Sequence, residues 1–182
     1  MATSTKPAEV TVPLPEGVNS SLEGYLLTIH GARGKVQRDF AKVDVELQVQ
    51  DASVVITVRG SRKKQLAALN TVRSHVRNMV EGVTRGYTYR LKVVYAHFPA
   101  TVRAKDKLVY IENFYGERSP RTADIIGDSK VSIEGDDVVI RGVSKEDVGQ
   151  TAANIEQSTR AKRKDQRVFL DGVYVYERKT GG

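Results

Sequence analysis

The chain has 182 residues with a formal net charge of +7, and 40% of its residues are apolar. That apolar share suffices for a folded core and excludes wholesale disorder, while the absence of cysteine excludes disulfides, thiolate metal ligands and cysteine nucleophiles. No apolar run approaches the roughly 20 residues of a membrane span, and the N-terminus lacks the apolar stretch of a signal peptide. We therefore expect a cytoplasmic protein with no membrane partner. Its positive net charge favours a binding partner that is acidic.

Strand-like segments dominate the first 60 residues. Segment 43–49 alternates apolar and polar residues at the period of two that is typical of a strand, and segments 25–29 and 54–58 are also predicted strands. After Gly60 the apolar spacing changes to three or four residues, which predicts an amphipathic helix of about five turns. Its apolar stripe consists of Leu66, Leu69, Val72, Val76, Met79 and Val83.

The second half repeats this order of elements. Segments 108–112, 131–134 and 138–141 have the composition of strands. Ser144 with Asp147 three residues later resembles a capping box, in which a hydroxyl accepts a backbone N–H of the first helical turn. A helix is expected to follow, and one of its faces carries Val148, Ala152, Ile155 and Thr159.

The two halves align best where segment 54–58, Gly60 and a helix match segment 138–141, Gly142 and a helix. Residue identity between the halves is low, so the order of elements carries the prediction of an internal duplication. Strands combined with one late helix per copy predict an α+β fold. We expect two similar small domains, each an antiparallel-rich sheet packed against one main helix.

The domain boundary is expected near Tyr89. Segment 87–95 alternates as a strand that either ends the first copy or links it to the second. This places an N-terminal domain at residues 1–88 and a C-terminal domain at residues 89–182.

A dense basic loop after the second helix is the strongest sign of a binding site. It contains Arg160, Lys162, Arg163, Lys164 and Arg167. Cations at the end of a helix can simply complement the helix dipole, but five within eight residues exceed that need and indicate a phosphate-bearing partner such as a nucleic acid. A solvated charged loop is the alternative. The polar helix face before the loop can form hydrogen bonds and consists of Gln150, Asn154, Gln157 and Ser158.

The turn around Ser119 and Arg121 is a second candidate for RNA contact. It follows two aromatic residues, Phe114 and Tyr115, and the mixture of aromatic rings, a rigid turn and arginine suits base stacking and phosphate contact. The alternative, which we favour for the two aromatic residues, is that they belong to the core at the edge of a sheet.

Catalytic patterns are absent from the sequence. The three histidines, His30, His75 and His97, lie in unrelated contexts and have no partner at metal-ligand spacing. No glycine-flanked nucleophile elbow is present. We therefore expect no enzymatic activity, no metal, no cofactor and no small-molecule substrate.

Six segments, spread in the same order over nearly the whole chain, match the pattern of one protein family. They are 10–17, 31–34 with 38–40, 71–84, 94–99, 112–117 and 169–174. With these segments the chain resembles the L6 family of large-ribosomal-subunit proteins (universal uL6) in its archaeal and eukaryotic branch. An archaeal source is favoured because the chain lacks the Lys-rich insertions and longer tail common in eukaryotic members.

The resemblance implies two similar α+β domains and a non-enzymatic protein. It also implies that the protein binds large-subunit ribosomal RNA mainly through its C-terminal domain, near the sarcin–ricin loop and the translation-factor-binding region, with ribosomal proteins as neighbours. By position, the contact candidates are residues 150–167 and 119–121. A free-standing RNA-binding module outside the ribosome and an enzyme acting on RNA stay open as alternatives.

Overall fold

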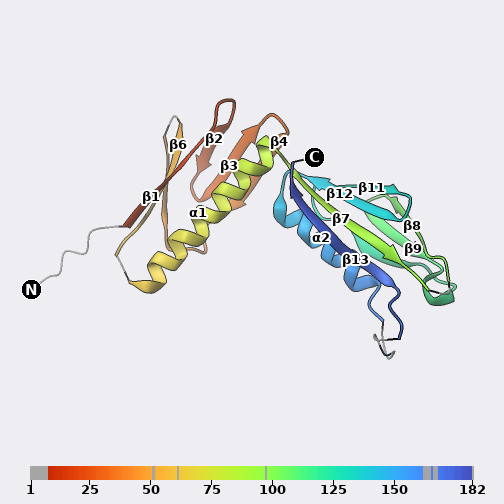
Figure 1. Ribbon diagram of the computed structural model, residues 1–182. Coiled ribbons are helices and arrows are strands. Elements are labelled where there is room, and N and C mark those ends of the chain that lie inside the picture. Colours follow the sequence, from red (N-terminus) through yellow and green to blue (C-terminus); the bar gives the residue numbers. More distant parts are fainter. Residues whose placement is uncertain are drawn as a thin grey trace, which may run out of the picture. The chain divides into compact units, whose positions relative to one another are not determined.

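The computed structural model describes residues 8–50, 52–60, 62–96, 98–161, 165 and 168–181. The chain divides into two compact units, one ending at Arg85 and the other beginning at Gly86. Figure 1 shows that each unit combines strands with one main helix. All strand pairings among the described residues are antiparallel, and the predicted α+β fold class is confirmed.

The first unit packs two three-stranded sheets against a helix. Its elements are β1 (Ala8–Pro13), β2 (Asn19–Glu23), β3 (Leu26–Gly31), β4 (Gly34–Asp39), β5 (Glu46–Gln50), β6 (Ser53–Val58) and α1 (Lys63–Thr84). The sheets have the orders β1-β6-β5 and β2-β3-β4. The predicted apolar stripe of α1 is buried from Leu69 to Val83 and packs on both sheets. Leu66, at the start of the stripe, is instead exposed.

The second unit has the same layers with one additional strand. Its elements are β7 (Tyr87–Val94), β8 (Thr101–Lys105), β9 (Leu108–Glu112), the short 3-10 helix η1 (Phe114–Gly116), β10 (Arg121–Asp124), β11 (Lys130–Glu134), β12 (Asp137–Gly142), α2 (Lys145–Ser158) and β13 (Gly172–Thr180). The sheets have the orders β11-β12-β7-β13 and β10-β9-β8. Helix α2 contacts β7, β10, β12 and β13.

The strand orders confirm the internal duplication. In the first unit β1-β6-β5 lies beside β2-β3-β4, and the second unit repeats this as β7-β12-β11 and β8-β9-β10. The main helix follows β6 in one copy and β12 in the other, which is the alignment predicted from the sequence. Strand β13 has no counterpart among the described residues of the first unit.

Strand β7 belongs to the second unit. It pairs with β12 on one side and with β13 on the other, and both partners come from the second half of the chain. The division between the units at residues 85 and 86 therefore precedes the expected boundary at Tyr89, which falls inside β7. An alternating pattern identifies a strand, but it does not reveal which strands will pair with it.

Local interactions fix the start of α2. Ser144 is the N-cap residue, and its hydroxyl accepts the backbone N–H of Asp147 at 3.2 Å, as the sequence predicts. Asp147 also lies in the first helical turn, where the helix dipole favours negative charge. Val148 and Ile155 are fully buried against the sheets, so the core fixes how α2 lies on them.

Candidate RNA interface

The polar face of α2 is tied in part to the neighbouring sheet. The side-chain amide of Gln150 donates to Asn154 Oδ1 at 2.9 Å, and Asn154 Nδ2 donates to the backbone carbonyl of Asp124 on β10 at 3.0 Å. Ser158 Oγ donates back to the carbonyl of Ile155 at 2.8 Å. Gln150 and Gln157 are exposed, so this face offers amide groups to a partner at two positions.

Arg121 joins the two regions that the sequence treats as separate candidates. It lies at the start of β10, and its Nη1 donates to the carbonyls of Ser158 at 2.9 Å and Arg160 at 3.3 Å. Its Nε and Nη2 bond the two carboxylate oxygens of Glu117 at 2.8 and 2.6 Å. The guanidinium carbon also lies 4.5 Å from the centre of the Phe114 ring. The turn at 119–121 is therefore fastened to the end of α2.

The surroundings of Arg121 stabilise its charge. The hydrogen-bonded carboxylate of Glu117 raises the pKa of Arg121 above its usual value, and partial burial opposes this shift. Its side chain is only 20% exposed, and four of its five N–H donors are directed at protein atoms. Arg121 thus acts mainly within the fold.

The position of Arg121 at the end of α2 helps to explain why the loop after this helix is basic. Helix α2 has no basic residue in its last turn. The guanidinium of Arg121 supplies a cation there, because it donates to the carbonyl of Ser158, the last helical residue, and to that of Arg160 just beyond the helix. Helix capping therefore does not account for the basic residues that follow. Of these, Arg160 is exposed, while Lys162, Arg163, Lys164 and Arg167 lie outside the described residues.

Buried hydrogen bonds hold both ends of the basic loop. Thr159 is 2% exposed, and its hydroxyl accepts the backbone N–H of Val173 at 3.0 Å, at the start of β13. The same hydroxyl lies 3.3 Å from the carbonyl of Ile155, to which it can donate. Asp171, also buried, accepts the backbone N–H of Ala96 at 3.2 Å. The loop therefore leaves α2 and returns to the sheet at fixed points.

The turn before Arg121 is divided between core and surface. Phe114 is 3% exposed and belongs to the core, which confirms the structural interpretation of that ring. Tyr115 is partly buried, and burial raises the pKa of its hydroxyl. Its φ of 54° lies in the left-handed region, where a non-glycine residue is strained. Ser119 is exposed.

Sequence reasoning missed the exposed apolar side chains around this turn. Phe98 lies 3.3 Å from the position that a Cβ on Gly116 would occupy, and the ring centres of Tyr115 and Phe169 are 6.2 Å apart. Leu170, next in the chain, is 59% exposed. The signal in the sequence is the unbroken apolar run 168–170 directly after the basic residues.

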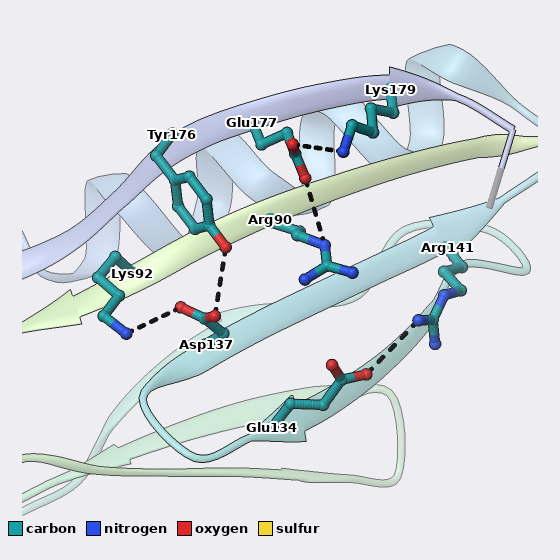
Figure 2. A network of polar contacts seen from close by, with 8 residues as sticks. All are labelled: Arg90, Lys92, Glu134, Asp137, Arg141, Tyr176, Glu177 and Lys179. Atoms are coloured by element: carbon teal, nitrogen blue, oxygen red, sulfur yellow. Dashed lines mark hydrogen bonds and ion pairs between the residues drawn. The ribbon is translucent and has the colours of Figure 1, made fainter.

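Cations on the outer face of the four-stranded sheet are paired, in contrast to Arg160. Arg90 Nε lies 3.3 Å from Glu177 and Lys92 Nζ lies 3.2 Å from Asp137, and Figure 2 draws both pairs. Tyr176 donates its hydroxyl to the same Asp137 carboxylate at 3.2 Å. The hydrogen bond with Tyr176 raises the pKa of Arg90, and that with Asp137 raises the pKa of Lys92. This face neutralises most of its own charge and is a weaker candidate for phosphate contact.

The described residues contain no group of three or more His, Asp or Glu side chains placed to hold a metal ion. His97 lies outside them. In the same part of the chain, no helix is both long and apolar enough to cross a membrane.

Comparison with known proteins gives the family. The family model for ribosomal protein L6 matches residues 14–86 and again residues 98–172, one match in each unit. Proteins named large ribosomal subunit protein uL6 are similar over most of their length. The one from Methanosphaera stadtmanae is 46% identical and aligns over 96% of both chains. That from Methanosarcina mazei is 44% identical over 92% of this chain and 96% of the relative.

A third uL6 protein, from Desulfurococcus amylolyticus, is 44% identical over 92% of both chains. The chain belongs to the ribosomal protein L6 family. The relatives are mostly archaeal, in agreement with the branch indicated by the sequence.

Proposed function

We propose that this chain binds large-subunit ribosomal RNA mainly through its second unit, near the sarcin–ricin loop and the translation-factor-binding region. Family membership makes it a non-enzymatic structural constituent of the large ribosomal subunit, located with the ribosome in the cytoplasm. Neighbouring large-subunit proteins are its further partners.

The bonding of Arg121 is the observation that carries this proposal. Because Arg121 satisfies the end of α2 from β10, the basic residues after the helix have no capping role to perform there. Positive charge without such a role, held on a loop with fixed ends, suits the phosphates of a nucleic acid. The paired outer face of the sheet offers no comparable surplus.

The basic loop contributes two kinds of phosphate contact in this proposal. The guanidinium groups of Arg160, Arg163 and Arg167 bind phosphates in a bidentate manner, whereas Lys162 and Lys164 act as point charges. The exposed amides of Gln157 and Gln150, which lie about two turns apart on the same face of α2, contact sugars or base edges, as is common where RNA is recognised by shape. Ser119 adds a hydroxyl beside the loop, and Arg121 serves as a positioning residue that holds the turn and the helix end together.

The salt dependence of RNA binding tests the proposal. Each phosphate contact contributes roughly 0.7–0.9 to the slope of log affinity against log salt. Replacing Arg160, Arg163 and Lys164 together by alanine is expected to weaken binding to large-subunit RNA and to reduce the slope by about 2–3. The free energy of unfolding should change little, because exposed substitutions usually shift it by less than about 0.5 kcal/mol. Unchanged affinity and slope in the folded variant would overturn the proposal.

A further inference from the structure

The duplication exposes a difference between two equivalent strands. In the second unit β7 is an interior strand, with β12 on one side and β13 on the other. Its counterpart β1 in the first unit pairs with β6 alone among the described residues. Figure 1 shows β13 running along β7. Among the described residues, one edge of the first unit therefore lacks the strand that completes the second unit.

The register of β1 shows which backbone groups face this edge. The N–H of Leu14 donates to the carbonyl of Ala52 at 2.9 Å, one step beyond the last aligned pair of β1 and β6. Because hydrogen-bonding direction alternates along an antiparallel strand, Val10 and Val12 are directed at β6. Glu9 and Thr11 thus direct their N–H and C=O groups outward, as does the carbonyl of Pro13. A proline at an outward position is what an edge strand tolerates, since its missing N–H leaves the ladder intact.

Burial in the two units shows what the additional strand does. On β7 the core-facing Leu91 is fully buried and Val93 is 8% exposed. Strand β13 places Val173 opposite Val93 and Val175 opposite Leu91. On β1 the core-facing Ala8 and Val10 are only half-buried, although both pack against the apolar cluster of their unit. The core side chains along this edge of the first unit are therefore more exposed to solvent than their counterparts in the second unit, which β13 covers.

We propose that the outer edge of β1 binds an extended, antiparallel strand of a neighbouring protein. Its backbone pairs with the outward groups of Glu9 and Thr11, and its apolar side chains cover Ala8 and Val10. A basic residue of the added strand lies opposite the exposed Glu9, as Glu177 of β13 lies opposite Arg90 with their side chains 3.3 Å apart. This surface does not depend on the RNA contacts of the second unit.

Two features favour a protein strand over RNA at this edge. Alternating N–H and C=O groups match the groups of another strand one for one, whereas a phosphate backbone presents acceptors only. Glu9 adds a negative charge that repels phosphate. Exposed edges of this kind are also sites of strand addition in other proteins.

Site-specific photo-crosslinking in assembled large subunits tests the proposal. Thr11 and Gln48 both pair with Val55 of β6, so they share one face and one row of the sheet but lie on opposite edge strands. A benzophenone amino acid at residue 11 is expected to crosslink to a protein segment in extended conformation with apolar residues at alternate positions. The same probe at residue 48 serves as the matched control and should not reach that segment. Crosslinks from residue 11 to RNA alone, to a helix or to nothing would overturn the proposal.

Competition during assembly tests the charge of the added strand. When Glu9→Lys and the unchanged chain are produced together, the variant is expected to enter large subunits several-fold less often. Gln48→Lys introduces the same lysine on the opposite edge strand, with a charge change of one unit in place of two, and should enter normally. The thermal midpoints of the free proteins establish that both variants fold. If Glu9→Lys entered large subunits as often as the unchanged chain, the proposed basic residue opposite Glu9 would be wrong.

Discussion

Replacing Arg121 by alanine tests the assignment of this residue as a positioning residue. The change removes the hydrogen bonds to the carbonyl of Ser158 at the end of α2, at 2.9 Å, and to that of Arg160 beyond it, at 3.3 Å, together with the bidentate pair with Glu117. It also removes the guanidinium from the face of Phe114, 4.5 Å away. Each of these contacts links β10 or the turn before it to another part of the second unit.

The contacts allow an order-of-magnitude forecast. Hydrogen bonds to the two carbonyls contribute about 1 kcal/mol each. The pair with Glu117 contributes about 0.2–1 kcal/mol, since that carboxylate is 42% exposed and screened by water. Stacking over Phe114 adds about 0.5–1 kcal/mol. Because water replaces some lost bonds, we expect Arg121→Ala to lower the free energy of unfolding of the second unit by about 2–3 kcal/mol.

Urea denaturation followed by a probe in the second unit measures this loss. Arg121→Lys is the matched control: it keeps the charge but cannot make the forked bonds, so an intermediate loss is expected. RNA binding separates positioning from direct contact. A positioning residue lowers affinity and leaves the salt slope unchanged, whereas a phosphate contact lowers the slope by roughly 0.7–0.9. A loss of stability below about 0.5 kcal/mol, or a reduced slope, would refute the assignment.

Two further predictions concern the packing and the charges of the second unit. A Cβ on Gly142 would lie 2.7 Å from a methyl carbon of Val148, so Gly142→Ala should destabilise the unit by about 1–3 kcal/mol. At Gly149 on α2 the nearest atom would be 3.9 Å away, so Gly149→Ala should stabilise the unit by up to about 1 kcal/mol. Thermal or urea denaturation compares the two variants, and equal effects on stability would contradict the packing. Asp137 raises the pKa of Lys92 above its ordinary value of 10.5, so its stabilising effect is complete below that value and disappears as the pH rises through the raised pKa. Asp137→Asn should lower the pKa of Lys92 toward 10.5, which an NMR titration would detect.

Local patterns explain what the sequence predicts well. Helix α2 starts at a Ser144 cap and follows an apolar spacing of three and four residues, and both signals depend on neighbours in the chain. The duplication is equally visible because β6 with α1 and β12 with α2 repeat one order of elements. In each case the predicted feature requires no knowledge of which distant segments meet.

Long-range partners explain what the sequence does not reveal. Arg121 bonds a carbonyl 37 residues away, and nothing in the run around it indicates that its donors are directed inward. The sequence also does not reveal strands β1 and β13, and the register of β13 with β7 shifts between Val175 and Glu177. Leu66 continues the apolar stripe of α1, yet it is 38% exposed.

The central claim is that the second unit provides the main RNA anchor, and a comparison of two salt slopes tests it most directly. One variant lacks three cations of the basic loop, Arg160, Arg163 and Lys164. The other lacks Arg59, Arg73 and Lys42, which are exposed cations of the same types in the first unit. We predict that the slope for binding large-subunit RNA falls by about 2–3 in the first variant and stays unchanged in the second. An equal or larger fall in the second variant would contradict the account.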